Sequence, residues 1–268
     1  MPYVLKASGE VEPFSKDKVV TSIQRAGIPK SLWADALVHV ESKIYNNIPT
    51  SEIYQHIEEF LEKSPNPNYK SRYSLKRAIM DLGPTGYPFE HYVAEIFKTL
   101  GFETKVGQIL TGRCISHEVD IIATKGQEKI FVECKFHNEP GTRSDVHVSL
   151  YTKSRFDDIA EKYNFTSAYL VTNTKITSDA LSYALCENIK VIGWSYPEGG
   201  SLRDLIEKYK LFPVTQISTL SLSDKQRITS EGIVLAKFLC QNPKAIPLDI
   251  PKERSDRILR EAQIVCAL

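Results

Sequence analysis

The chain has 268 residues, of which 42% are hydrophobic and 25% charged, a balance typical of a soluble globular protein with more than one domain. No apolar run approaches the roughly 18 residues of a membrane-spanning helix, and the N-terminus lacks a signal-peptide pattern, so we expect no membrane partner. The net charge of +1 gives no global electrostatic case for nucleic-acid binding, which must depend on local patches. The five cysteines are widely spaced, which argues against zinc or a disulfide framework and favours a reducing cytoplasm.

The first region, residues 1–83, is predicted to form a hairpin followed by four short helices. Ser15 is expected to cap the first helix, and a second helix is expected over 31–45. The third helix is expected to begin at Thr50, as its N-cap, and the fourth to span 68–82. A hairpin and four helices make a self-contained unit of about 80 residues.

The segment from Val4 to Gly27, VLKASGEVEPFSKDKVVTSIQRAG, resembles the start of an ATP-cone, the nucleotide-binding regulatory module best known from ribonucleotide reductases. The resemblance implies that ATP or dATP is contacted by Val4, Lys6, Lys18 and Thr50. Lysines neutralise phosphates, and a helix start offers free N–H donors to the same anion. The sequence has no P-loop and no GxGxxG motif, so we expect the nucleotide to be a sensed ligand rather than a fuel.

A second hairpin is predicted over 117–137, where two apolar strands flank a turn at Gly126. Three charged residues are placed in this hairpin, Asp120, Glu133 and Lys135. Because side chains alternate along a strand, Glu133 and Lys135 share a face, and an antiparallel register closing on the turn could bring Asp120 alongside them. Two carboxylates that meet at the ends of buried strands repel each other unless a cation lies between them.

This arrangement suits phosphodiester hydrolysis. The carboxylates of Asp120 and Glu133, with the backbone carbonyl of Cys134, are hard oxygen ligands for Mg²⁺. The metal would polarise the phosphate and lower the pKa of an attacking water, while Lys135 orients that water or steadies the developing charge. Glu118 could be a further ligand, although an exposed acid at the strand end is the simpler interpretation. The alternative for the whole hairpin is an ordinary amphipathic one with a Glu-x-Lys surface pair.

The segments 120–123 (DIIA) and 132–135 (VECK) resemble the PD-(D/E)xK nuclease motif in the version of Mrr-like restriction endonucleases. Val119 stands in place of the proline of the motif name, and Glu133 in place of the glutamine of many Mrr-like enzymes. The resemblance implies a Mg²⁺-dependent endodeoxyribonuclease that acts on double-stranded DNA. It also implies that Glu90 faces the active site, as a metal-site residue or base. A glutamate favoured by the dipole at a helix N-terminus is an equally good interpretation of Glu90.

The nuclease domain is predicted over 84–210, after a breaker-rich linker at 83–88. A helix, the catalytic hairpin, a long helix over 144–163 and a strand–helix–strand run fit a restriction-endonuclease-like mixed sheet with helices on both faces. The first half of the long helix, with Lys153 and Arg155, could follow a phosphate backbone.

Residues 211–268 are predicted to form a helical C-terminal segment. Its apolar helices have few partners within so short a segment, so we favour a role in dimerisation, over nucleic-acid binding or capping of the nuclease. A homodimer would also supply one active site for each DNA strand. The sequence therefore predicts an α/β (α+β multi-domain) protein that is a metal-dependent nuclease regulated by ATP or dATP. The alternative is a catalytically silent, nucleotide-sensing regulator that binds nucleic acid.

Overall fold

The computed structural model describes residues 2–6, 9–66, 68–139, 141–247 and 249–267. It divides into two compact units, Met1–Lys76 and Arg77–Leu268, and each is described by itself. Among the described residues, none of the helices combines the length and the hydrophobicity that a membrane span requires.

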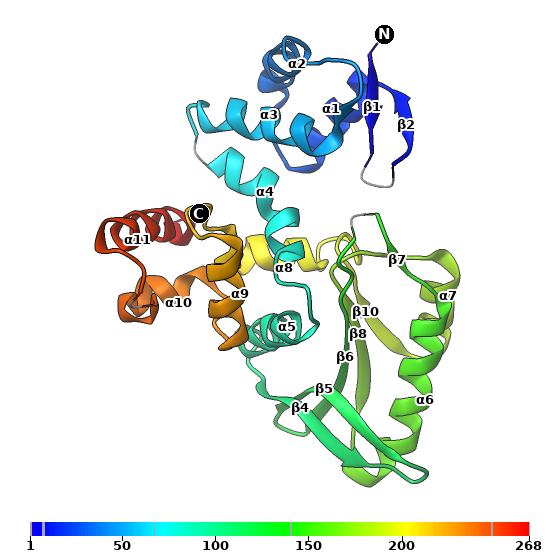
Figure 1. The fold of residues 1–268 in the computed structure, drawn as a ribbon. Coiled ribbons are helices and arrows are strands. Elements are labelled where there is room, and N and C mark those ends of the chain that lie inside the picture. The colour runs from blue at the N-terminus through cyan, green and yellow to red at the C-terminus, as the bar shows by residue number, and fades with distance from the viewer. Residues whose placement is uncertain (1, 7–8, 67, 140, 248, 268) are drawn as a thin grey trace. The chain divides into compact units, whose positions relative to one another are not determined.

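The first unit combines a small sheet with helices (Figure 1). Strands β1 (Tyr3–Leu5) and β2 (Val11–Pro13) form the predicted antiparallel hairpin. A two-residue strand, β3 (Ile48–Pro49), pairs parallel to β1 and was not predicted. The helical elements are α1 (Lys16–Arg25), the 3₁₀ helix η1 (Lys30–Leu32), α2 (Trp33–Glu41), α3 (Thr50–Glu62) and α4 (Asn68–Met80). The hairpin-plus-four-helix prediction is confirmed, and the last residues of α4, from Arg77, belong to the second unit.

The predicted helix starts were confirmed in part. Ser15 caps α1, because its Oγ accepts the N–H of Lys18 over 3.3 Å. The prediction that Thr50 caps α3 is wrong, since Pro49 is the N-cap residue and Thr50 is the first residue of the helix. The reason is the parallel pairing of Pro49 with Leu5, which extends the backbone up to the helix.

The second unit is built on a mixed sheet of five strands in the order β10-β8-β6-β5-β4 (Figure 1). The strands are β4 (Glu103–Thr111), β5 (Ser116–Lys125), β6 (Glu128–Lys135), β8 (Ser167–Thr172) and β10 (Ile189–Ile192). Pairing is antiparallel from β4 to β6 and parallel from β6 to β10. A separate parallel pair, also not predicted, joins β7 (Arg143–Ser144) and β9 (Lys175–Ile176).

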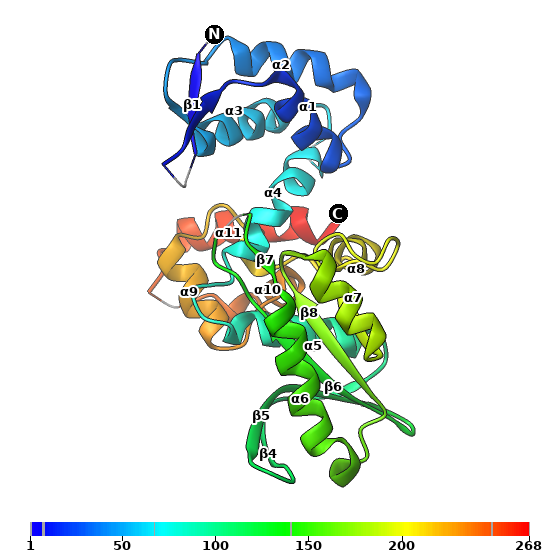
Figure 2. The ribbon, with the colours of Figure 1, turned by 90° about the vertical axis from the view of Figure 1, so that its right-hand side faces the viewer.

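Helices cover both faces of this sheet, as predicted. Helix α5 (Tyr87–Thr99) packs on β4, β5 and β6 from one side. Helices α6 (Val146–Tyr163) and α7 (Ser178–Cys186) cover the other side, and they lie in front of the sheet in Figure 2. The apolar layer between the sheet and these two helices includes Phe131, Ile159 and Ala184, all fully buried. Helix α8 (Leu202–Tyr209) follows β10.

The C-terminal segment belongs to the same compact unit as the sheet. It contains η2 (Val214–Gln216), α9 (Leu222–Ser230), α10 (Ala236–Gln241), η3 (Pro243–Ala245) and α11 (Lys252–Ala267). Helix α9 packs on α5, and α10 packs on α11, which buries Ile228, Leu239 and Ile258. The argument for dimerisation from apolar helices without partners is therefore wrong, because these helices have partners within the chain.

Helices α10 and α11 are also joined by a disulfide between Cys240 and Cys266. The expectation of a chain without a disulfide framework is wrong at this one pair. The two cysteines are 26 residues apart, and only the packing of the two helices brings them together. Cys114, Cys134 and Cys186 are free thiols.

Candidate functional site

Strands β5 and β6 place the two predicted metal ligands level with each other. Ile121 pairs with Val132, and the same register sets Asp120 opposite Glu133. The Oδ2 atom of Asp120 accepts a hydrogen bond from the backbone N–H of Cys134 over 2.7 Å. Asp120 is therefore fixed to the strand that carries the other predicted catalytic residues.

The carboxylates of this region raise one another's pKa. Burial, and then the negative charges of Asp120 and Glu118, raise the pKa of Glu90 to about 7. Burial and the charge of Asp120 raise the pKa of Glu133 to about 8. Burial also raises the pKa of Asp120, against the lowering effect of the hydrogen bond from Cys134. The structure thus brings Glu90, from the first turn of α5, near the carboxylates of the hairpin. A bound proton or cation would relieve the repulsion between these negative charges.

Arg155 of α6 supplies a positive charge that was not assigned to this site from the sequence. Its Nη1 donates to Oε2 of Glu133 in an ion pair whose side chains are only 7% and 12% exposed. The guanidinium also lies over the rings of Phe131 and Tyr151. Arg155 is therefore unavailable to a phosphate backbone, contrary to the prediction for this helix. Lys153, the other predicted contact, forms ion pairs with two neighbouring carboxylates.

Lys135 is the last residue of β6, and its side chain is exposed. Beside the carboxylates, α5 and β4 border a pocket of about 570 Å³. Its lining includes Glu90 and the exposed Glu118, together with Tyr87, His91, Ala94, Glu95, Lys98, Thr104, Val106 and Gly107. The pocket thus leaves open space next to Glu90.

The oxygen donors of Asp120 and Glu133 fit a cation that is held by two carboxylates. Within the described ranges, no group of three or more histidine, cysteine, aspartate or glutamate side chains forms a ready-made metal centre. Asp120 and Glu133 offer hard oxygen donors on adjacent strands, and a cation between them would offset the burial and the neighbouring negative charges that raise their pKa values. The three predicted metal ligands, including the carbonyl of Cys134, stay a prediction.

We expect the stability of the metal-free protein to fall as the pH rises from 4.5, the ordinary pKa of a glutamate, to about 8. In this window the folded state still binds the proton of Glu133 whereas the unfolded state has lost it, so a rise in pH favours unfolding. The raised pKa of Glu90 contributes with the same sign. Melting temperatures of the metal-free protein across this window should fall less steeply for Glu133→Gln, which cannot titrate. Equal slopes for the two proteins would contradict this prediction.

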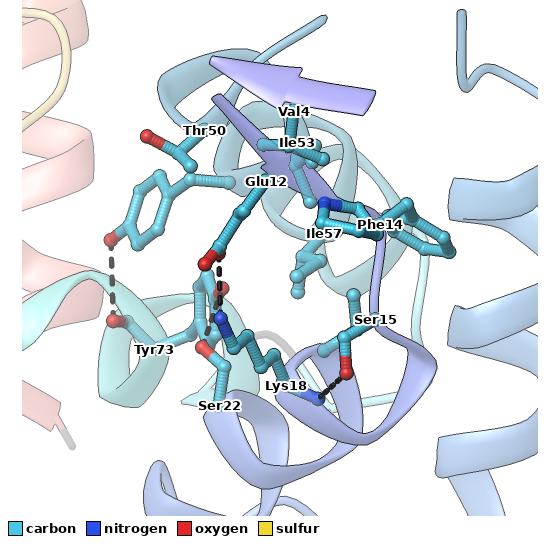
Figure 3. Close-up of a pocket in the computed structure, with 13 residues that line it drawn as sticks. Val4, Glu12, Phe14, Ser15, Lys18, Ser22, Thr50, Ile53, Ile57 and Tyr73 are labelled. Atoms are coloured by element: carbon cyan, nitrogen blue, oxygen red, sulfur yellow. Dashed lines mark hydrogen bonds and ion pairs between the residues drawn. The ribbon is translucent and has the colours of Figure 1, made fainter. Parts of the chain in front are cut away.

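The first unit holds a pocket of about 180 Å³. Of the four predicted nucleotide contacts, Val4, Lys18 and Thr50 line it, whereas Lys6 is not among the described residues of its lining. The rest of the lining is mainly apolar and aromatic: Glu12, Pro13, Phe14, Ser15, Val19, Ser22, Ile53, Tyr54, Ile57 and Tyr73. Figure 3 shows Lys18 and Glu12 pointing toward each other beside the apolar side chains.

Glu12 of β2 and Tyr73 of α4 are pocket residues that were not assigned from the sequence. Glu12 accepts from Nζ of Lys18 over 2.6 Å through Oε1 and lies 2.9 Å from Nζ of Lys6 through Oε2. Both lysines predicted to bind phosphate can thus reach one anion. The buried hydroxyl of Tyr73 lies 3.0 Å from Oγ of Ser22, which fixes α4 against α1.

Two family models match the parts of the chain that contain the two pockets. Residues 2–82 match the ATP cone domain, and residues 84–195 match the restriction endonuclease model of the Mrr type. The chain is therefore an ATP-cone domain followed by an Mrr-type restriction endonuclease domain, which confirms both resemblances found in the sequence.

The comparison with whole proteins is more specific. The chain is 41% identical over 175 residues to an uncharacterized protein of Archaeoglobus fulgidus. The matched region spans 65% of this chain and 99% of the relative. It is 31% identical to the crystal structure of AF1548, a protein of unknown function, with a TM-score of 0.61 over 68% of this chain and 99% of that one. Residues 212–266 match the AF1548-like C-terminal model. The chain belongs to the AF1548-like family.

A third similarity is weak. Can2 from Sulfobacillus thermosulfidooxidans, solved in complex with cyclic tetra-adenylate, is 13% identical with a TM-score of 0.37 over 75% of this chain and 64% of its own. This similarity is too low to indicate a shared function.

Proposed function

We propose that the chain is a metal-dependent nuclease that hydrolyses phosphodiester bonds in DNA and is regulated by ATP or dATP. The observation that carries the proposal is the convergence of Glu90, Asp120 and Glu133 in an Mrr-type domain, on whose strand β6 Lys135 follows Glu133 by two residues. A surface that only binds a polyanion gains nothing from clustered carboxylates, because they repel phosphate.

In this mechanism Asp120 and Glu133 hold the cation together with the backbone carbonyl of Cys134. When bound, Mg²⁺ supplies a Lewis acid that polarises the phosphate and lowers the pKa of the attacking water. Lys135 orients that water or stabilises the charge that develops on the phosphate. Glu90, whose pKa is raised to about 7, can accept a proton from the water near neutral pH.

The pocket of the first unit is the proposed site for the regulatory nucleotide. Its apolar walls, which include Val4, Phe14 and Ile57, suit the base, and the ammonium groups of Lys6 and Lys18 suit the phosphates. Glu12, which now binds both lysines, would have to share them with the phosphates. We further propose double-stranded DNA as the substrate and a homodimer as the active form, because cutting both strands takes two active sites.

Cleavage of supercoiled plasmid tests the proposal directly. We expect cleavage with Mg²⁺, none with excess EDTA, and a change in rate when ATP is added. Lys18→Met should weaken ATP affinity about 10-fold, the effect of losing one charge-assisted hydrogen bond, and leave cleavage without ATP unchanged. Lys16→Met is the matched control, since Lys16 lies on the same helix but pairs with Glu41.

Failure to cut DNA with any divalent cation would favour the alternative, a catalytically silent regulator that senses nucleotides. The ion pair of Arg155 with Glu133 is the observation in its favour, because it occupies a predicted metal ligand. A mobility-shift assay would then support this alternative if the chain binds DNA without cutting it and ATP changes that binding.

A further inference from the structure

The backbone that follows β6 has an unusual partner. The pairing of β6 with β8 ends where Lys135 lies opposite Thr172. The next residue of the β8 chain, Asn173, is fully buried. Its Oδ1 accepts the N–H of His137 over 2.9 Å, and its Nδ2 donates to the carbonyl oxygen of His137 over 2.9 Å. The side-chain amide thus pairs with both polar groups of one residue, in the way a neighbouring strand would.

This clamp fixes the chain on the far side of Lys135. On the near side, the N–H of Cys134 is held by the carboxylate of Asp120 over 2.7 Å. Lys135 therefore lies between two fixed points of the backbone. Cys134, directly before it, is bonded to a proposed metal ligand, and His137, two residues after it, is held by Asn173. A lysine side chain has four rotatable bonds, so the direction of its ammonium depends on how well its backbone is fixed.

The ring of His137 is held as well. Its Nε2 lies 2.9 Å from Oγ of Ser144, which in turn donates to Oγ1 of Thr172 over 3.1 Å. Ser144, Thr172 and Asn173 are all fully buried. Buried polar groups stabilise a fold only when they are all satisfied, and here their bonds converge on His137, the second residue after the proposed catalytic lysine.

We propose that Asn173 is a positioning residue for Lys135, which acts through the backbone of His137. The side-chain amide of Asn173 extends the hydrogen bonding of β6 to His137, two residues beyond the last pair with β8. In this way it holds the ammonium of Lys135 toward the carboxylates. Neither the family matches nor the motif around Lys135 assigns Asn173 a role, since it lies 36 residues from its partner. The proposal rests on the proposed function, because it takes Lys135 to be catalytic.

The test compares single-turnover cleavage of a DNA duplex by the full chain and by Asn173→Asp, which keeps the shape but removes the donor to the carbonyl of His137. We expect the rate at saturating DNA to fall about 10²-fold, the effect of a small misplacement of a catalytic group. Affinity for DNA in EDTA and affinity for Mg²⁺ by calorimetry should stay within about 2-fold, because the metal ligands keep their own bonds. Asn173→Ser, a smaller change that a water can bridge, should show a partial loss if the aspartate variant does not fold.

Ser149→Ala is the matched control. Ser149 is a fully buried residue of α6, and its hydroxyl donates to the carbonyl oxygen of Ala180, on α7. It should lower the melting temperature about as much as Asn173→Asp and leave the cleavage rate unchanged. Equal loss of rate in both variants, or a wild-type rate in a folded Asn173→Asp, would overturn the proposal while the nuclease stands. A wild-type chain that cuts no DNA, or a Lys135→Met variant that still cuts, would overturn the proposed function and this inference together.

Discussion

Replacing Asp120 with asparagine is expected to lower the rate of DNA cleavage about 10²- to 10³-fold and to leave the fold intact. Asparagine has the same shape, and its amide oxygen can still accept the N–H of Cys134 that Asp120 now binds. The substitution removes the negative charge that a divalent cation requires from its ligand. Plasmid cleavage at fixed Mg²⁺ measures the loss, and thermal unfolding checks that the variant is folded.

A matched control is available on the same hairpin. Glu128 begins β6 and pairs with Lys125 at the end of the hairpin away from Asp120. Glu128→Gln removes one negative charge from the hairpin and should leave cleavage within about 2-fold of wild type. Comparable loss in both variants would mean that total charge, and not a ligand at Asp120, governs the reaction.

The largest expected loss of stability comes from Arg155→Met. Removing one partner of a buried ion pair leaves the other charge uncompensated, which costs about 3–5 kcal/mol of the free energy of unfolding. Glu133 is that other charge, and it lies with Arg155 at a site where burial already raises the pKa of Glu133. Denaturant unfolding at about pH 9, above the pKa of about 8 at which Glu133 loses its proton, measures the difference in the absence of divalent cations.

Lys153→Met on the same helix serves as the comparison, because the ion pairs of Lys153 with Asp157 and Glu187 are more exposed. We expect this variant to lose about 1 kcal/mol or less. The double variant Arg155→Met/Glu133→Leu should recover most of the stability, since apolar side chains can replace a buried ion pair. Similar losses for Arg155→Met and Lys153→Met would show that the pair with Glu133 is not buried in solution.

Local patterns predicted the hairpin of the candidate site because its geometry is local. A tight turn and the alternation of side chains are enough to bring Asp120 opposite Glu133, and pairing of Ile121 with Val132 is the register that a turn at Gly126 produces.

The residues that surround this hairpin could not be predicted from such patterns. Arg155 and Asn173 meet their partners across 22 and 36 residues, through the packing of α6 and the parallel pairing of β8 against β6. The amino-acid sequence of α6 shows Arg155 among other charged residues, with nothing that marks it as buried. The N-cap prediction at Thr50 failed for a similar reason, since strand β3 exists only through its pairing with β1.

Helix α4 limits how the ATP-cone domain and the endonuclease domain can be exchanged between proteins. By sequence similarity the cone extends to residue 82, yet the compact unit that contains it ends at Lys76. The intervening residues are anchored in the second unit, where the carbonyl of Ala78 accepts the hydroxyl of Thr215 and Asp81 pairs with Lys225. A recombination joint at the sequence boundary would remove these anchors from the nuclease. A functional chimera should instead be spliced inside the helix, so that a new ATP-cone domain inherits the last turn of α4 from its host.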